Sequence, residues 1–552
     1  MTSKITRQAN ASEDSLLRIF TAPEDSTSTL SIIEQKLSQD LAGFLGNSIA
    51  ALEKPLSEIE TDFSAYQIPT DPKFVSDYAD EIMQNLVAHS VHTSAPSFIG
   101  HMTSALPYFV LPLSKMMVGL NQNLVKIETS KAFTPLERQV LGMMHHLVYQ
   151  QSDHFYHQWM HSANHSLGAF CSGGTVANIT ALWIARNRLL QPCGDFKGVT
   201  REGMTKALRF YGYDDLAILV SDRGHYSLGK TADLLGIGRD NIISIPTDEH
   251  HKVDVAAMRD AAEKLAQQNI KVMAIVGIAG TTETGNVDPL TELAALASEL
   301  NCHFHVDAAW GGASLLSKKY SHLLKGIELA DSVTIDAHKQ MYVPMGAGMV
   351  LFKDPELAKA IVHHAEYILR VGSKDLGSQT LEGSRPGMAM LVHACLQIIG
   401  RDGYEILINN SLEKARYFGS IIDQHADFEL VTAPELCLLT YRYVPKSVQA
   451  ILTTALANQD TVLVASINEL LDGLTQFIQK HQREQGKSFV SRTRIKPAKY
   501  LRQQTTVFRV VLANPLTSHQ ILHDVLTEQV EIAALDSEYL PQLLALIAQT
   551  HQ

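Results

Sequence analysis

A lysine stands at the point where a short buried strand is expected to end. The segment SVTIDA, residues 332–337, runs directly into His338 and Lys339, and a glycine-bearing turn follows. Ligands of open α/β sheets bind at the carboxyl ends of strands, and a partly desolvated lysine there can act as an amine nucleophile. Alone, Lys339 is more simply explained as a surface lysine that closes a strand, so the neighbouring motifs decide its interpretation.

An aspartate ends a second expected strand. The segment HFHVDAAWGGA carries Asp307 into a turn made by Gly311 and Gly312. A carboxylate at this place can pair with a protonated ring nitrogen, and the charge-assisted bond would keep that ring electron-withdrawing. Ala309 should face the same way as Asp307 and leave space for a flat ring. The alternative is an aspartate that only caps the turn.

A glycine-rich turn opens an amphipathic helix at residues 170–188, FCSGGTVANITALWIARNR. Gly173, Gly174 and Thr175 would point backbone N–H groups and a hydroxyl at an anion, and the helix dipole would add attraction. These features suit a phosphate group, or, taken alone, an ordinary helix N-cap. A nucleotide is disfavoured because no G-K-[ST] sequence follows.

His225 follows a third expected strand, in SDRGHYSLGK. Its imidazole could stack on a cofactor ring and take part in proton transfer, although a structural histidine is the simpler interpretation of any single one. Ser227 and Lys230 form an S-x-x-K pair like that of penicillin-binding enzymes, but no S-D-N or K-T-G sequence accompanies it. Serine acyl transfer is therefore disfavoured.

The remaining polar motifs are weaker. AGTTETGNVDP, residues 279–289, places threonines and Asp288 after another strand, and SQTLEGSRPG carries Ser384 and Arg385. The histidines clustered between residues 145 and 165 lack an H-E-x-x-H or carboxylate pattern, so we expect no metal site.

Short apolar strands that alternate with helical patterns are expected to position these residues. The strand segments LAILVS, NIISIP, VMAIVGIA, HFHVDA, SVTIDA and GMVLF all fall within residues 113–392. Such alternation predicts an α/β domain with a largely parallel sheet covered by helices. Residues 1–112 are expected to form an N-terminal helical arm and lobe. Residues 393–552 are predicted to form a smaller α+β lobe, with strands at CLLTYRYV and TTVFRVVLA.

The composition fits a folded protein that acts on small molecules. The 552 residues are 45% hydrophobic and 19% charged, with a net charge of −12. This acidic balance argues against nucleic acid or a membrane surface as the main partner. The five cysteines are dispersed without C-x-x-C spacing, and neither a signal peptide nor a membrane span is expected. We therefore expect a reduced, cytoplasmic protein.

The motifs agree in chain order with a known family. SGGTVAN, DRGHYS, GTTETGNVDP, HVDAAWGG and DAHK resemble those of the group II pyridoxal-phosphate-dependent amino-acid decarboxylases, the family of glutamate and aromatic amino-acid decarboxylases. The resemblance spans roughly residues 90–530 and includes FRVVLANP, residues 508–515. It implies fold type I of the pyridoxal-phosphate enzymes, pyridoxal 5'-phosphate as cofactor, and a homodimer with active sites at the subunit interface.

The resemblance also implies roles for single residues. Lys339 would form the Schiff base with the cofactor, Asp307 would bind the pyridine nitrogen, and His225 would stack on the ring and serve in catalysis. The further contacts implied are Ala309, Gly174, Thr175, Thr281 and His338 for the cofactor, and Arg509 and His101 for the substrate.

A mobile loop of the family delivers a tyrosine from the partner subunit. The corresponding segment, HHAEYILRVGSKDLGSQTLEG, contains one tyrosine, Tyr367, which lies earlier than a simple alignment would place it. The resemblance implies Tyr367 as the donor of a proton to the substrate Cα.

The implied reaction is α-decarboxylation of an acidic L-amino acid. SFIGHMTSALP and DLGSQTLEGSRPG resemble bacterial members that act on aspartate, so we expect β-alanine and CO2 as products. Glutamate is the second expectation, since one methylene changes binding by only about 1–3 kcal/mol. 2,4-Diaminobutyrate and cysteine sulfinate stay open. An aminotransferase or lyase of the same fold, or a relative without catalysis, would be alternatives of another class.

Overall fold

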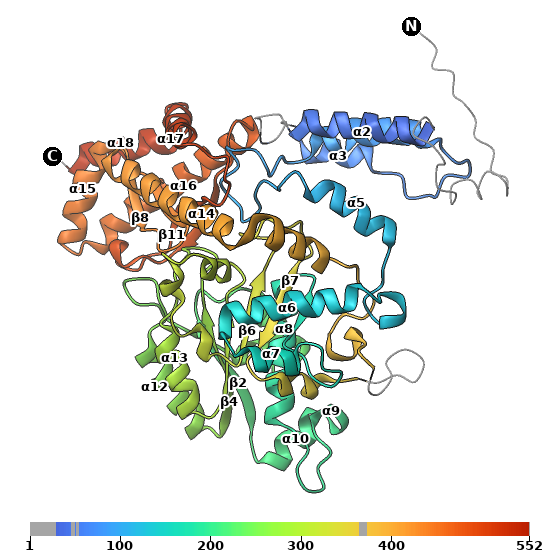
Figure 1. Cartoon of the computed structure of the whole chain (residues 1–552). Coiled ribbons are helices and arrows are strands. Elements are labelled where there is room, and N and C mark those ends of the chain that lie inside the picture. Colours follow the sequence, from blue (N-terminus) through green and yellow to red (C-terminus); the bar gives the residue numbers. More distant parts are fainter. Residues whose placement is uncertain (1–28, 46–49, 51–53, 364–372, 551–552) are drawn as a thin grey trace.

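Two lobes that each contain a sheet, together with an N-terminal helical region, make up the molecule (Figure 1). The structure, a computed structural model, describes residues 29–45, 50, 54–363 and 373–550. In Figure 1 the N-terminal helices extend sideways from the C-terminal lobe, above the larger lobe. These helices are α2 (Thr29–Leu45), α3 (Leu56–Asp62), α4 (Val75–Asn85) and α5 (Val110–Leu120).

The larger lobe is built on a seven-stranded sheet in the order β1-β7-β6-β5-β4-β2-β3. Neighbours among β2 to β6 pair in parallel, whereas β7 is antiparallel to both β1 and β6. The central strands are buried, and β4 is mostly apolar, as expected where helices cover both faces. The strands are β1 (Gly168–Cys171), β2 (Asp215–Ser221), β3 (Ile242–Ile245), β4 (Ile270–Ile278), β5 (His303–Asp307), β6 (Ser332–Asp336) and β7 (Gly348–Phe352).

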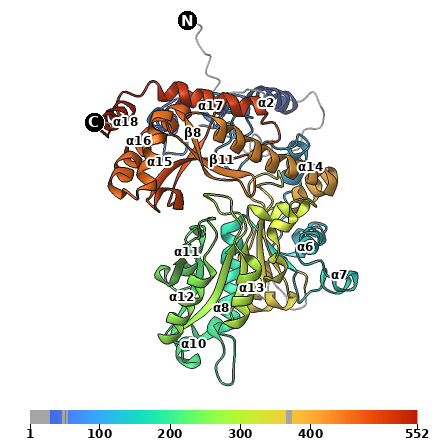
Figure 2. The same cartoon turned by 90° about the vertical axis from the view of Figure 1, so that its left-hand side faces the viewer.

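Helices cover this sheet, with α11 and α12 on one side and α6 and α7 on the other in Figure 2. The helices of the lobe are α6 (Phe133–Tyr149), α7 (Asp153–Trp159), α8 (Gly174–Leu189), α9 (Val199–Glu202), α10 (Met204–Tyr211), α11 (Ser227–Leu234), α12 (Val255–Gln267) and α13 (Leu290–Glu299). Because the parallel strands all run the same way, the loops that follow β2, β4, β5 and β6 gather at one edge of the sheet.

The smaller lobe contains a four-stranded antiparallel sheet in the order β10-β11-β9-β8. Its strands are β8 (Phe428–Thr432), β9 (Leu438–Tyr443), β10 (Ser491–Ile495) and β11 (Thr505–Val511). Its helices are α14 (Ala389–Gln424), α15 (Lys446–Ala457), α16 (Thr461–Gln485), α17 (His519–Ala533) and α18 (Tyr539–Thr550).

Helix α14 connects the two lobes. It packs against α6 in the larger lobe and against β8 in the smaller one. The helix is interrupted at Gly400, whose φ of 67° and ψ of 170° are accessible to glycine at little cost. The boundary expected between residues 392 and 393 falls within this helix.

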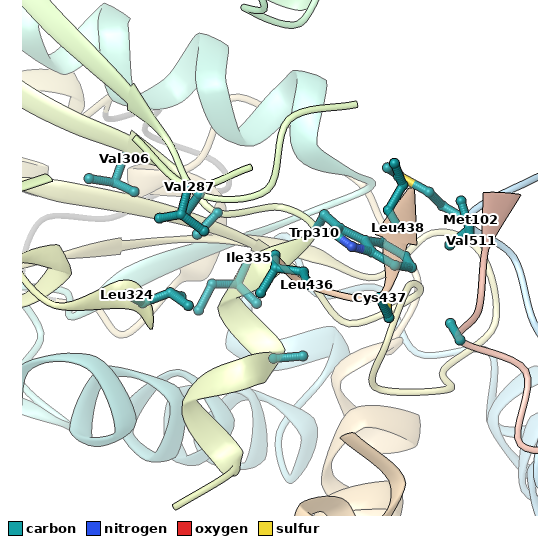
Figure 3. Close-up of a cluster of buried hydrophobic side chains, with 14 of the residues drawn as sticks. Met102, Val287, Val306, Trp310, Leu324, Ile335, Leu436, Cys437, Leu438 and Val511 are labelled. Carbon is teal, nitrogen blue, oxygen red and sulfur yellow. The ribbon is translucent and has the colours of Figure 1, made fainter. Parts of the chain in front are cut away.

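A buried apolar cluster lies where the two lobes meet (Figure 3). In this view Trp310, which follows β5, lies beside Leu436 and Leu438 of the smaller lobe. A Cβ on Gly280 would lie only 3.0 Å from Trp310 Cδ1 and 3.1 Å from Leu436 Cδ1, and the φ of Gly280 is +99°. Both the space and the backbone therefore require glycine at this turn. The cluster fixes the loops after β4 and β5 against the smaller lobe.

The expected strands are all present, and three short ones were missed. β1 merges with the glycine-rich turn that follows it, β8 is only partly buried, and β10 alternates with charged side chains. The sheet is largely parallel, as expected, with β7 antiparallel to both of its neighbours. Among the described residues, no helix is both long and apolar enough to span a bilayer.

Buried His145 in α6 is expected to make stability depend on pH. Its Nδ1 lies 2.9 Å from the Tyr156 hydroxyl, and its Nε2 lies 3.0 Å from the Phe352 carbonyl oxygen. Burial lowers its pKa to about 4, whereas a histidine in an unfolded chain titrates near about 6.5. The unfolded chain therefore binds a proton that the folded chain does not. The resulting stabilisation is complete above about pH 6.5 and is lost as the pH falls through about 4.

We expect wild-type protein to lose about 1–2 kcal/mol more unfolding free energy than a His145→Asn variant when the pH falls from about 7 to about 5. Urea denaturation at the two pH values measures this difference. The neighbouring His146 is exposed, so a His146→Asn variant should follow the wild-type pH dependence. Equal losses in wild type and His145→Asn would show that His145 does not carry the effect.

Candidate active site

A cavity of about 360 Å³ opens at the carboxyl edge of the parallel strands. Its wall comes from the first turn of α8 and from the loops that follow β2, β4, β5 and β6. The fold therefore brings together segments that lie far apart in the sequence. The residues expected from the sequence that line this cavity are Gly174, Thr175, His225, Asp307, Ala309, His338 and Lys339.

Lys339 lies on the wall beside Asp336, an aspartate that the sequence analysis did not single out. The Lys339 Nζ is 3.0 Å from Asp336 Oδ2 at the end of β6, and that carboxylate is almost fully buried. His338 Nε2 lies 3.6 Å from the same oxygen, and burial lowers the pKa of this imidazole. Within the described residues, Asp336 Oδ1 and His338 Nδ1 are buried without a hydrogen-bond partner. Buried polar atoms normally have partners, so this corner is suited to receive a polar ligand.

The first turn of α8 offers an anion site next to Lys339. The first N–H groups of a helix have no partner within the helix, and its N-terminus attracts negative charge. A Cβ on Gly174 would lie 2.8 Å from Asp336 Oδ2, so glycine allows α8 to approach β6 this closely. Thr175 lines the cavity beside it. This arrangement fits a phosphate group held by backbone N–H groups and a hydroxyl.

Asp307 ends β5 and presents an oriented carboxylate to the cavity. It is 7% exposed, its Oδ1 accepts a hydrogen bond from the Ala309 N–H at 3.1 Å, and its Oδ2 accepts one from Asn178 Nδ2 at 2.8 Å. A buried carboxylate held in this way can pair with a cationic ring nitrogen. Ala309 is small and lies on the same wall, which leaves room for the ring.

Asn178 in α8 links Asp307 to a buried histidine. Its Nδ2 donates to Asp307, so its Oδ1 accepts from His305 Nε2 at 3.1 Å. His305 Nδ1 then accepts from the Ser332 hydroxyl at 2.8 Å. Burial lowers the His305 pKa to about 4, which keeps the ring neutral near pH 7. Asn178 was not predicted from the sequence; its signal is an amide four residues after Gly174, on the same face of the helix.

His225 lies half-buried on the cavity wall after β2. Its Nδ1 is 2.9 Å from the Ser227 hydroxyl, which orients the ring. Burial lowers the pKa of His225, and the charge of Asp307 opposes this effect only in part. A neutral, oriented imidazole at this place can stack on a planar ligand or exchange a proton with it.

Thr281 does not line the cavity that the described residues form. It is fully buried, its hydroxyl lies 2.8 Å from that of Thr284, and it accepts a hydrogen bond from the Asn286 N–H at 3.1 Å. The next residue, Thr282, lines the cavity instead. Tyr367 lies outside the described residues.

Arg509 in β11 and His101 lie near the cavity but are not part of the wall formed by the described residues. Arg509 Nε donates to the Thr282 carbonyl oxygen at 2.6 Å, and Nη1 donates to that of Gly100 at 3.2 Å. Burial lowers the Arg509 pKa to about 10, so the side chain stays charged near neutral pH. The pKa of His101 is lowered by burial and then by the charges of Arg509 and Lys339. His101, Arg509 and Lys339 are therefore close enough for their charges to interact.

Comparisons with known proteins relate this chain to a family of enzymes. A family model described as "Pyridoxal-dependent decarboxylase conserved domain" matches residues 55–444. The protein named aspartate 1-decarboxylase from Aliivibrio fischeri (strain ATCC 700601 / ES114) is 63% identical over 540 residues, which cover 97% of each chain. The L-2,4-diaminobutyrate decarboxylase from Rhizobium meliloti (strain 1021) is 28% identical over 407 residues, which cover 72% of this chain and 76% of that protein.

A solved structure has the same fold. The crystal structure of the glutamate decarboxylase domain of diaminobutyrate-pyruvate transaminase and L-2,4-diaminobutyrate decarboxylase from Vibrio parahaemolyticus matches with a TM-score of 0.77 at 18% identity, covering 95% of this chain and 100% of that chain. The α/β fold expected from the sequence is thus confirmed. The family model spans most of the chain, and the cavity combines a lysine, a buried aspartate and an open helix N-terminus. This chain belongs to the pyridoxal-dependent decarboxylase family.

Proposed function

We propose that this pyridoxal-phosphate-dependent decarboxylase removes the α-carboxyl group of L-aspartate and releases β-alanine and CO2. The observation that carries the choice of substrate is the 63% identity, along 97% of the chain, to a protein named aspartate 1-decarboxylase. The charges around the cavity support it, because Lys339 and Arg223 line the wall and Arg509 lies behind it. Asp307 and Asp336 line the same wall, and Lys339 is paired with Asp336, so an arginine is the group that can bind the second carboxylate of aspartate.

Pyridoxal phosphate fits the groups that the cavity offers. The N-terminus of α8 would hold its phosphate, Asp307 its ring nitrogen, and His225 one face of its ring. The unpartnered Asp336 Oδ1 and His338 Nδ1 are further polar atoms available to it. When bound, the cofactor supplies an electron-withdrawing ring that takes up the electron pair left by the departing CO2.

Lys339 and Asp336 would exchange a proton at the cavity wall. The 3.0 Å between Lys339 Nζ and Asp336 Oδ2 lets the carboxylate hold the charged lysine and accept its proton when the amine acts as a nucleophile. Asp307, oriented by Asn178 and the Ala309 N–H, would pair with the ring nitrogen. The assignment of the Cα proton donor to Tyr367 stays a prediction.

Asn178→Ala is expected to weaken pyridoxal phosphate binding about 10-fold to 100-fold, because it removes the amide that orients Asp307. Titration of apoprotein with the cofactor, followed by absorbance, measures the dissociation constant. Asn187 lies in the same helix and is also buried, but its amide donates to the Ala360 carbonyl oxygen. Asn187→Ala serves as the control and should bind the cofactor as the wild type does. Unchanged binding in Asn178→Ala would remove this amide from the cofactor site.

The substrate is tested by turnover of a mixed amino-acid pool with mass spectrometric identification of the products. We expect β-alanine to accumulate with CO2. Accumulation of 4-aminobutyrate, 1,3-diaminopropane or hypotaurine in place of β-alanine would assign glutamate, 2,4-diaminobutyrate or cysteine sulfinate as the substrate. A keto acid formed without CO2 would identify an aminotransferase instead.

A homodimer and a cytoplasmic location are part of this proposal. Support for the dimer comes from Met345, which lines the cavity yet is 63% exposed, and from exposed apolar side chains in the N-terminal region. These side chains include Leu56, Ile68, Tyr108 and Val118. Exposed apolar surface of this kind is typical of an interface between subunits. Light scattering should give twice the 60.8 kDa mass of one chain; the mass of one chain would exclude the dimer.

The five unpaired cysteines support a location in the reducing cytoplasm, which cell fractionation would test.

A further inference from the structure

Arg223 occupies the turn after β2 and lines the cavity. The turn is tight, since the Gly224 N–H donates to the Ser221 carbonyl oxygen at 2.8 Å and the Arg223 N–H donates to the Ser221 hydroxyl at 3.1 Å. A Cβ on Gly224 would lie 2.9 Å from Val220 Cγ2, so glycine is needed at that position. The backbone that carries Arg223 is therefore well fixed, and the residue is only 8% exposed.

The guanidinium of Arg223 lacks the partners that a buried arginine normally has. Its Nε is buried without a hydrogen-bond partner, and no acceptor among the described residues bonds to its side chain. The nearest carboxylate is that of the adjacent Asp222, whose Oδ1 lies 3.5 Å from Nε and whose side chain is 39% exposed. Its charge therefore has one long ion-pair contact with a part-exposed carboxylate and no hydrogen bond, and such a guanidinium at a cavity wall is poised for an anionic ligand.

The other charged groups near the cavity already have assigned partners. Lys339 pairs with Asp336, and Arg509 donates to two backbone carbonyl groups. Burial raises the pKa of Glu283, and this effect is larger than the opposing effect of the nearby charges of Arg223 and Arg509. Burial therefore opposes the ionisation of Glu283. Glu283 forms no ion pair with either arginine among the described residues. Arg223 is thus the cavity cation most available to a ligand.

We propose that Arg223 binds the side-chain carboxylate of the substrate and so makes the cavity selective for amino acids with a short anionic side chain. This inference rests on the proposed function, in which the cavity already binds an amino acid. A guanidinium can bind a carboxylate through two parallel hydrogen bonds, which fixes orientation as well as charge. The same charge repels the ammonium side chain of 2,4-diaminobutyrate. Cysteine sulfinate, whose side chain is also anionic, would be accepted on the same grounds.

The experiment compares wild type with Arg223→Gln and Arg223→Lys. The first readout is the ratio of kcat/KM for L-aspartate to that for L-asparagine, which has a neutral side chain of almost the same shape. Both values come from one sample, so the ratio is independent of the folded fraction. We expect the ratio to fall about 100-fold in Arg223→Gln and less in Arg223→Lys, which retains the charge.

The second readout is calorimetric binding of succinate, a dicarboxylate without an amine, to holoenzyme. We expect Arg223→Gln to weaken succinate binding about 100-fold. Arg492→Gln is the matched control because Arg492 is exposed on β10 and lines a different cavity. An unchanged succinate affinity in Arg223→Gln, or an equal loss in Arg492→Gln, would overturn the role of Arg223.

The two readouts separate this inference from the proposed function. A wild type that does not decarboxylate aspartate refutes the proposed function, and the succinate measurement alone then decides the role of Arg223. A wild type that is active on aspartate, with an unchanged substrate ratio in Arg223→Gln, refutes the inference and leaves the function in place.

Discussion

Lys339→Ala is expected to decrease decarboxylation by at least about 10⁴-fold, because no other amine of the described residues lines the cavity to act as the nucleophile. Its position supports this expectation. The side chain emerges at the carboxyl end of β6, and Asp336 holds its Nζ at 3.0 Å. CO2 release under substrate saturation measures the loss.

Covalent attachment gives a second measurement for Lys339. After reduction with borohydride, the wild-type holoenzyme should carry the mass of the cofactor on the peptide that contains Lys339, and the alanine variant should not. Lys353 provides the control, since it follows β7 and its Nζ lies 3.3 Å from the Leu329 carbonyl oxygen. Lys353→Ala should keep full turnover. Substantial activity in Lys339→Ala, or cofactor mass on another lysine, would contradict the assignment.

Asp307→Asn is expected to lower kcat by about 10²–10³-fold, because it removes the charge that stabilises a cationic ring while conserving shape. The substituted side chain retains an oxygen that can accept from the Ala309 N–H, but its NH2 group cannot accept the hydrogen bond from Asn178. Steady-state kinetics with saturating cofactor separates a loss of kcat from a loss of cofactor binding.

Asp331→Asn is the matched control for Asp307→Asn. Asp331 accepts a hydrogen bond from the Phe304 N–H at 2.8 Å, next to the same strand β5, but lies at the amino end of β6 and away from the cavity wall. It should leave kcat unchanged. A wild-type kcat in Asp307→Asn would mean that its carboxylate does not act on the ring nitrogen.

The core of the site could be predicted from the sequence because strand ends and turns have strong local signatures. Apolar runs ending in Asp307 or Lys339, and glycines opening α8, mark the carboxyl edge of a parallel sheet before any coordinates are known. The structure places these segments around one cavity. The order of the motifs along the chain identified the family, which no single residue could do.

The features that the sequence did not reveal depend on fine geometry. Whether Thr281 or Thr282 faces the cavity is decided by one turn, at which Gly280 adopts a φ of +99°. Asn178 matters through a hydrogen bond to Asp307, across 129 positions of sequence. Arg223 stands out only because its guanidinium lacks a hydrogen-bond partner among the described residues, and a missing hydrogen bond cannot be seen in a sequence.

Position-specific isotope release shows which carboxyl group of aspartate leaves as CO2. Purified holoenzyme would be given L-aspartate labelled with ¹³C either at C1 or at C4, and the CO2 in the headspace would be analysed by mass spectrometry. α-Decarboxylation should release labelled CO2 from the C1-labelled substrate alone, together with β-alanine. Labelled CO2 from the C4-labelled substrate with formation of alanine, or no CO2 from either, would contradict it.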